Sequence, residues 1–183
     1  MKECTISRSI DTVTTIFGHF VTILGDRRWL DGKKSPDTRL VAVFHSHVDV
    51  LSQEEIPKQF CEKESNIRCI ITTVAFGMGI SIPDISYIIH WGPPQDVLTY
   101  WQEVGRCARD GREGKAIMYT PPYSMDNRRV DQSMLNIIKN ANTNCIRQNI
   151  LLTFKVGGMT ETDIKACCFH ERCCTFCTEQ KSK

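Results

Sequence analysis

Apolar residues along this chain alternate between short runs and longer stretches with helical spacing. Five short runs, rich in β-branched and apolar residues, predict strands: residues 4–7, 40–44, 67–74, 85–91 and 116–120. Five amphipathic stretches predict helices: residues 10–24, 52–60, 96–109, 125–140 and 145–154. Strands that alternate with helices favour an α/β fold with a parallel sheet covered on both faces.

Short sequence motifs indicate where two helices begin and where a loop lies. Ser52 precedes Glu55 by three residues, the spacing of a capping box, so we expect Ser52 to be the N-cap of its helix. Asp96 is expected to cap the helix at 96–109. Residues 25–38 are polar, contain Gly and Pro, and predict a loop.

Two consecutive prolines, Pro121 and Pro122, follow the last predicted strand. We therefore expect one domain at residues 1–122 and a smaller helical one at 123–183. The two helices of the second domain precede a cysteine-rich tail.

Composition narrows the class of protein only slightly. Hydrophobic residues make up 41% of the chain and charged residues 24%, as in ordinary globular proteins. The net charge of +2 gives no strong evidence for nucleic-acid binding. Residues 1–10 are charged and lack an apolar core, which predicts an intracellular protein without a signal peptide or a membrane partner.

The ten cysteines are unevenly placed, and six of them lie between residues 145 and 177. Without a secretory signal, such a cluster favours a metal site over a disulfide framework. Cys174 and Cys177 form a C-x-x-C pair that can place two thiolates on one metal ion. The alternatives are small buried residues or free thiols in the tail.

The residues with the clearest chemistry are two arginines in the segment Gln-Glu-Val-Gly-Arg-Cys-Ala-Arg-Asp-Gly at 102–111. We expect Arg106 and Arg109 at the end of the predicted helix, on one face because they are three residues apart. A guanidinium stays charged and can bond two oxygens of a phosphoryl group at once. The alternative is that both face water at the helix C-terminus.

The residues around the two arginines resemble motif VI of superfamily 2 helicases. Upstream, Thr-Val-Ala-Phe-Gly-Met-Gly-Ile at 73–80 resembles motif V of the RecQ family, and segments 7–10 and 44–46 resemble two further motifs in the same order. The chain thus resembles the C-terminal part of a RecQ-type DNA helicase. This resemblance implies a RecA-like second helicase lobe followed by a small helical zinc-binding module.

The resemblance also implies roles for individual residues. Arg109 corresponds to the arginine finger, and Arg106 and Gln102 are expected to face the nucleotide. Residues implied in DNA contact and in coupling to the nucleotide site are Gly77, Gly79, Ser81, Thr73 and His45. Ser81 stands where the family usually has an aspartate, so we expect weaker coupling between ATP and DNA.

In the family's zinc module a cysteine opens a helix and three more follow. The set expected here is Cys145, Cys168, Cys174 and Cys177, with Cys167 as the alternative to Cys168. Cys173 and His170 are also within reach in the sequence. Four protein ligands leave no open position for water, so the zinc would be structural.

The implied activity is ATP-dependent 3′–5′ unwinding of single-stranded or forked DNA. ATP and Mg²⁺ belong to a complete two-lobe motor, because these 183 residues contain neither Gly-x-x-x-x-Gly-Lys-[Ser/Thr] nor Asp-Glu-x-His. The missing first helicase lobe is therefore an expected partner, and this chain alone is expected to be inactive. DNA processing suggests the nucleus, with the cytoplasm as an alternative. Rival interpretations are a non-catalytic nucleic-acid-binding or regulatory module and an inactive gene relic.

Several other residues have a less specific interpretation. Trp91 and Trp101 can stack on bases but are expected in the core. His45 and His47 are expected to have a surface or motif role. Arg128 and Arg129 are expected on a solvated face at the start of the helix at 125–140.

Overall fold

The computed structural model describes residues 1–74, 82, 85–160, 162, 164 and 173–181. The chain divides into two compact units. The first unit contains Met1–Pro93 and Gln102–Ser124, and the second contains Pro94–Trp101 and Met125–Lys183.

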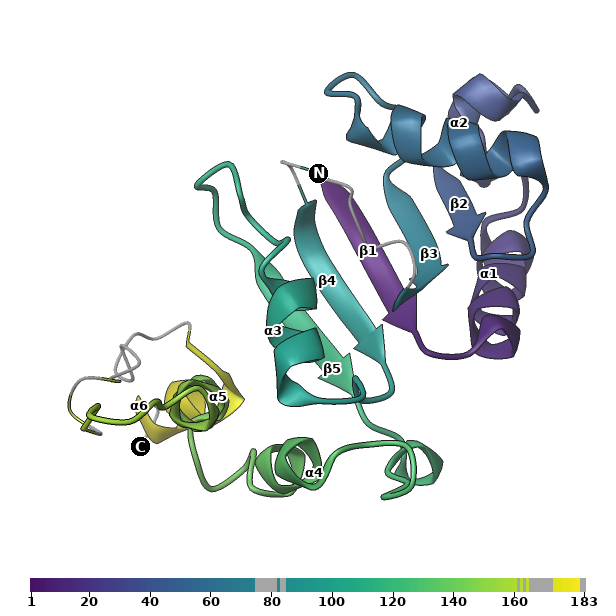
Figure 1. Ribbon diagram of the computed structural model, residues 1–183. Coiled ribbons are helices and arrows are strands. Elements are labelled where there is room, and N and C mark those ends of the chain that lie inside the picture. The colour runs from purple at the N-terminus through teal and green to yellow at the C-terminus, as the bar shows by residue number, and fades with distance from the viewer. Residues whose placement is uncertain (75–81, 83–84, 161, 163, 165–172, 182–183) are drawn as a thin grey trace. The chain divides into compact units, whose positions relative to one another are not determined.

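The first unit is built on a five-stranded sheet (Figure 1). Its strands are β1 (Lys2–Ser7), β2 (Val41–Phe44), β3 (Cys69–Thr73), β4 (Ile85–Trp91) and β5 (Lys115–Tyr119). They lie in the order β2-β3-β1-β4-β5, and every neighbouring pair is parallel. The predicted α/β fold with a parallel sheet is therefore confirmed.

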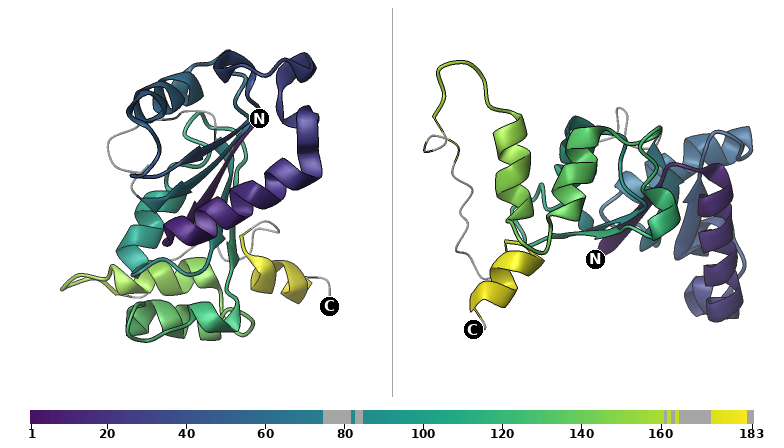
Figure 2. Two further views of the ribbon diagram at one scale, coloured as in Figure 1. Left: turned by 90° about the vertical axis from the view of Figure 1, so that its right-hand side faces the viewer. Right: turned by 90° about the horizontal axis from the view of Figure 1, so that it is seen from below.

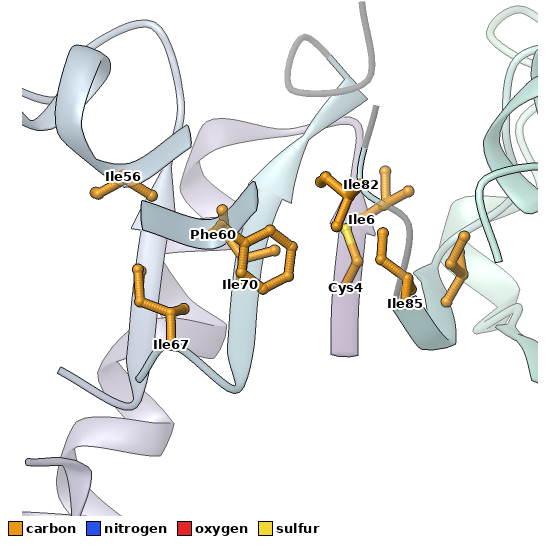
Figure 3. Packing of buried hydrophobic residues seen from close by; sticks show 10 residues of the cluster. Cys4, Ile6, Ile56, Phe60, Ile67, Ile70, Ile82 and Ile85 are labelled. Atoms are coloured by element: carbon orange, nitrogen blue, oxygen red, sulfur yellow. The ribbon is translucent and has the colours of Figure 1, made fainter. Parts of the chain in front are cut away.

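Helices cover the two faces of this sheet because alternate residues of each strand point to opposite sides. α1 (Ile10–Leu24) lies along one face of the sheet (Figure 2). Its Val13 packs against Cys69 and Ile71 of β3. α2 (Val50–Cys61) covers the opposite face, where its buried side chains join a larger cluster (Figure 3). The buried members of that cluster are Cys4, Ile6, Ala42, Ile56, Phe60, Ile67, Ile70, Ile82, Ile85 and Ile88.

The cap of α2 differs from the prediction. The helix begins at Val50, and the N-cap is Asp49, whose carboxylate accepts the backbone N–H of Ser52 at 2.9 Å. Ser52 therefore lies in the first turn and is not the N-cap. An ionised carboxylate three residues earlier is the stronger acceptor for the helix's unpaired N–H groups.

The segment between α1 and β2 is a loop, as predicted, and it folds into short turns of 3₁₀-helix. These are η1 (Gly25–Arg28), η2 (Leu30–Gly32) and η3 (Pro36–Thr38). The two ends of this loop are held together by an isolated antiparallel bridge between Trp29 and Arg39.

α3 (Val97–Val104) begins after Asp96, whose carboxylate accepts the N–H of Thr99 at 2.7 Å, so the predicted cap is confirmed. The helix ends five residues earlier than predicted. Beyond Gly105 the chain continues as turns, and Ala108 takes a left-handed conformation with φ of 57° that no α-helix can accommodate. Arg106 and Arg109 therefore lie on a turn and not on a helix face.

The second unit is helical in its described part. It contains α4 (Gln132–Lys139), α5 (Ile146–Thr153) and α6 (Thr175–Lys181), and a further turn, η5 (Pro122–Ser124), precedes it. α4 starts seven residues later than predicted, because Asp131 caps it and Asp126 accepts the N–H of Arg128 in a separate turn. Arg128 and Arg129 thus precede the helix, although their side chains are solvated as expected.

The two tryptophans expected in the core are exposed. Trp91 is 38% exposed and Trp101 39%. Trp91 lies beside Tyr119 at the ends of β4 and β5, with ring centroids 5.7 Å apart, and Trp101 lies 6.0 Å from Phe154. Each indole therefore contacts an aromatic neighbour and stays partly exposed to solvent. Among the described residues, no helix combines the length and apolarity that crossing a membrane needs.

Candidate functional site

The predicted site residues of the first unit fall into two groups, at opposite ends of the parallel strands. Arg106 and Arg109 lie on the turn whose Ala108 N–H donates to the carbonyl oxygen of Ile85, the first residue of β4. Thr73 is the last residue of β3, and His45 directly follows β2. The structure therefore separates the arginines from Thr73 and His45 by the length of the sheet.

The arginine turn presents its two side chains differently. Arg109 is exposed, and its Nε donates to the carbonyl oxygen of Gly105 at 3.1 Å. Arg106 is half-buried. Gln102 is exposed near the end of α3, three residues before Gly105. The structure thus places one exposed and one half-buried guanidinium within a short stretch of chain.

The electrostatic environment of this turn favours the binding of an anion. Burial and the like charge of Arg109 lower the pKa of the Arg106 guanidinium, while the nearby Cys4 and Glu103 oppose that shift. A lowered pKa means that the cationic form is less stable here than in water. An added negative group would relieve this penalty, as phosphate oxygens do beside paired arginines.

Sequence reasoning missed a buried pair beside the arginine turn. Nε2 of His90, in β4, lies 2.8 Å from Oε2 of Glu103, in α3, and the side chains are only 3% and 8% exposed. Both residues were visible in the sequence, and Glu103 is the neighbour of Gln102. Their partnership has no local signal, because it depends on how α3 returns over β4.

The second group, Thr73 and His45, is buried at the ends of β3 and β2. Thr73 is 8% exposed and His45 9%, so of the two expected roles of His45 the surface one is wrong and the motif role stays a prediction. Nδ1 of His45 accepts the N–H of His47 at 3.2 Å. Burial and the neighbouring His47 lower the pKa of His45, which agrees with a neutral ring that accepts at Nδ1. The other three predicted residues, Gly77, Gly79 and Ser81, lie outside the described residues.

Four cysteine thiols come together in the second unit. The Sγ atoms of Cys145, Cys173, Cys174 and Cys177 all lie within 4.8 Å of one another. Cys145 is also the N-cap of α5, where its Sγ accepts the N–H of Gln148 at 3.5 Å. The predicted ligands Cys168 and Cys167, together with His170, lie outside the described residues, so that part of the prediction stays open.

The thiol cluster has the dimensions of a tetrahedral zinc site. Sγ atoms of Cys145 and Cys173 are 3.7 Å apart, and zinc–sulfur bonds of about 2.3 Å place tetrahedral ligands roughly 3.8 Å apart. Although burial opposes it, hydrogen bonds from Gln148 and from the neighbouring thiols lower the pKa of Cys145. Burial raises the pKa of Cys173 to about 11 and also raises that of Cys177. The raised pKa values of Cys173 and Cys177 mean that these two thiols resist ionisation without a cation, and a metal ion that binds thiolates would supply one.

Comparison with known families identifies the first unit. The family described as the helicase conserved C-terminal domain matches residues 2–111, which contain β1, β2, β3 and β4 and end before β5. The chain belongs to this family. The match includes both arginines of the turn and the strand β4, to which the turn is hydrogen-bonded through Ala108.

Curated relatives specify the branch of the family. The chain is 34% identical to the mouse exonuclease and ATP-dependent helicase WRN, over 47% of this chain and 6% of that protein. It is 40% identical to the Arabidopsis thaliana ATP-dependent DNA helicase Q-like 4B, over 43% of this chain and 7% of that one. With the Bacillus subtilis probable helicase RecS it shares 32% over 64% of this chain and 24% of that protein. The predicted RecQ-type C-terminal lobe is confirmed, and the chain spans a small part of these relatives' length.

Solved structures share the fold at low sequence identity. The C-terminal domain of the DEAD-box protein Dbp5 superposes with a TM-score of 0.53 and 21% identity, covering 87% of this chain and 72% of that one. The Mycobacterium smegmatis helicase Lhr, solved with single-stranded DNA and AMP-PNP, gives a TM-score of 0.57 at 15% identity, over 76% of this chain and 17% of that one. The RecA-like helicase lobe is thereby confirmed as the fold.

Proposed function

We propose that this chain is the second motor lobe of an ATP-dependent 3′–5′ DNA helicase and works only with a first lobe. The observation that carries the proposal is the turn bearing Arg106 and Arg109, within the segment that matches the helicase family. An exposed, permanently charged guanidinium such as that of Arg109 suits a role at a phosphoryl group that another domain holds.

The motifs of this chain indicate which lobe binds ATP and which supplies the arginines. Its 183 residues include no glycine-rich phosphate loop and no acidic box for magnesium, so ATP and Mg²⁺ would be bound by the first lobe. When the lobes close, Arg109 would stabilise the charge that develops on the γ-phosphate. Arg106 and Gln102 would contact the nucleotide from the same turn and the end of α3.

The opposite end of the sheet is the proposed DNA side. Thr73 and His45 lie at the ends of neighbouring strands there, and Gly77, Gly79 and Ser81 follow Thr73 in the sequence. Contacts to the phosphates of single-stranded or forked DNA would make binding dependent on salt and largely independent of sequence. With Ser81 in place of a carboxylate, ATP turnover would respond weakly to DNA.

We further propose that residues 123–183 form a zinc-binding module of the RecQ type. The four clustered thiols of Cys145, Cys173, Cys174 and Cys177 support it, with Cys168 or Cys167 as rivals to Cys173. The metal would be structural, because four thiolates complete a tetrahedral site. The protein would act in DNA recombination and repair, and hence in the nucleus.

One pair of measurements tests the motor assignment. The chain alone should show no DNA-stimulated ATPase, whereas the chain joined to a RecQ-type first lobe should hydrolyse ATP. In the joined protein Arg109→Ala should reduce kcat by roughly 10³-fold or more while ATP binding is kept. Lys63→Ala, at an exposed position outside the segment 102–111, is the matched control. Full turnover by Arg109→Ala would reject Arg109 as the finger.

The second candidate is a non-catalytic nucleic-acid-binding or regulatory module. The observation that favours it is the uncharged Ser81, which stands where the family usually has an aspartate that couples DNA to the nucleotide site. It predicts salt-dependent binding of single-stranded DNA by the chain alone, and no ATPase when a first lobe is joined to it.

A further inference from the structure

Two contacts with a single strand hold the segment that carries the arginines. At one end, Oε2 of Glu103 lies 2.8 Å from Nε2 of His90, the sixth residue of β4. At the other end, the N–H of Ala108 donates to the carbonyl oxygen of Ile85, the first residue of β4, at 2.8 Å. The chain from 103 to 108 therefore runs back along β4 and is fixed to it at both ends.

The contact at Glu103 reaches the arginines through the backbone. The carbonyl oxygen of Glu103 accepts the N–H of Arg106 at 3.2 Å, and Arg106 precedes the anchored Ala108 by two residues. Cys107, between them, points its Sγ to the carbonyl oxygen of Ser86 in β4 at 3.4 Å. Any displacement of Glu103 thus moves the start of the turn while its far end stays in place.

We propose that His90 and Glu103 are positioning residues for the nucleotide-facing arginines. The inference rests on the proposed function, and it adds two residues that act through Arg106 and Arg109 without touching nucleotide themselves. His90 is itself fixed, because β4 is paired on both sides and His90 lies opposite Ile6 in β1 and Met118 in β5. A rigid strand thereby sets the geometry of the turn.

The alternative is that the pair merely stabilises the fold. Burying a carboxylate and an imidazole requires a partner for each, whatever their role. Two kinds of variant distinguish a role of the pair in stabilising the fold from a role in positioning the arginine turn. Replacing both groups by apolar ones removes the unpaired polar group and restores stability, yet it does not restore the hydrogen bond. Glu103→Gln keeps an oxygen acceptor for His90 and removes only the charge.

The first test needs only the chain itself. In native-state hydrogen exchange, Glu103→Met should speed exchange of the Arg106 and Ala108 amides by roughly tenfold or more relative to the rest of the sheet. Glu103→Gln should leave these amides protected. Ile71→Ala, a buried change on the opposite face of the sheet, is the control and should not single out the turn. Unchanged exchange at both amides in Glu103→Met would overturn the proposal.

The second test uses the chain joined to a first lobe. His90→Leu with Glu103→Met should recover the stability lost by either single change, but kcat should stay roughly tenfold or more below the parent with KM for ATP little changed. Glu103→Gln should retain most of kcat. A double variant with full kcat would assign the pair a purely structural role.

The two proposals can fail separately. If Arg109→Ala keeps full turnover, the proposed function is wrong, and the exchange experiment still reports whether the pair fixes the turn. If Arg109→Ala loses turnover while the double variant keeps it, only the positioning role is wrong.

Discussion

The ammonium group of Lys2 donates a hydrogen bond to the carbonyl oxygen of Phe60 at 2.7 Å, although 58 positions separate the two residues in the chain. A second bond of 2.7 Å reaches the carbonyl oxygen of Glu62, and the ammonium lies 5.4 Å from the centroid of the Phe60 ring. Lys2 has no exposed surface. A cation at the end of α2 satisfies carbonyls that the helix leaves open and interacts well with its dipole.

Lys2→Met is therefore expected to destabilise the first unit. Two charge-assisted hydrogen bonds are lost and two carbonyls lose this donor, at a cost of roughly 2–4 kcal/mol. Urea unfolding followed by fluorescence measures the difference. Lys63→Met, on an exposed lysine next to the same helix end, is the control and should change stability little. Equal stability of the two variants would contradict the buried role of Lys2.

Gly114 should not tolerate a side chain. A Cβ there would overlap Cys107 Sγ and lie 2.9 Å from the Cβ of Ala108, so Gly114→Ala should cost about 1–3 kcal/mol. Adding Cys107→Ala should recover part of that loss, because it removes the sulfur. Gly18→Ala, with nothing within 4 Å, is the control. Thermal unfolding of the parent, Gly114→Ala, Cys107→Ala and the double variant measures the coupling between the two positions. Strictly additive changes in stability would refute the predicted overlap.

The cap of α2 makes a prediction about pH. Hydrogen bonds from the backbone N–H and side chain of Ser52 lower the pKa of Asp49. A folded pKa below the unfolded value gives stability that is present at neutral pH and is lost as pH falls below about 4. Asp49→Ala should lower Tm by a few degrees at pH 7 and progressively less toward pH 2, whereas Ser52→Ala, which keeps the backbone N–H donor, should have a smaller effect. A larger effect of Ser52→Ala would restore Ser52 as the cap.

The thiol cluster predicts one zinc ion per chain. Chelation, or Cys174→Ser, should remove the metal and reduce the helical circular dichroism, because binding supplies much of the folding energy of small metal modules. Cys61→Ser, outside the cluster, should keep full zinc content. Cys173→Ser and Cys168→Ser compared by elemental analysis decide the third ligand. Zinc lost only from Cys168→Ser would exclude Cys173.

Much of the fold could be predicted from the sequence, because strands and helices follow local periodicity. The five strands, α1 and the cap at Asp96 agree with the pattern of apolar residues. The local pattern predicted helix ends wrongly where a neighbouring carboxylate or a left-handed residue determined the end of the helix. Asp49 displaced Ser52 as the cap of α2, and the left-handed backbone at Ala108 ended α3 before the arginines.

The sequence by itself determined which chemistry is present: the spacing of Arg106 and Arg109, and a cysteine cluster that includes Cys174 and Cys177. Only the tertiary structure decided which groups meet. His90 reaches Glu103 and Lys2 reaches Phe60 because helices pack back onto parallel strands, and in the second unit Sγ of Cys173 comes within 3.7 Å of Sγ of Cys145. Such contacts depend on the packing of whole elements, which no short stretch of sequence encodes.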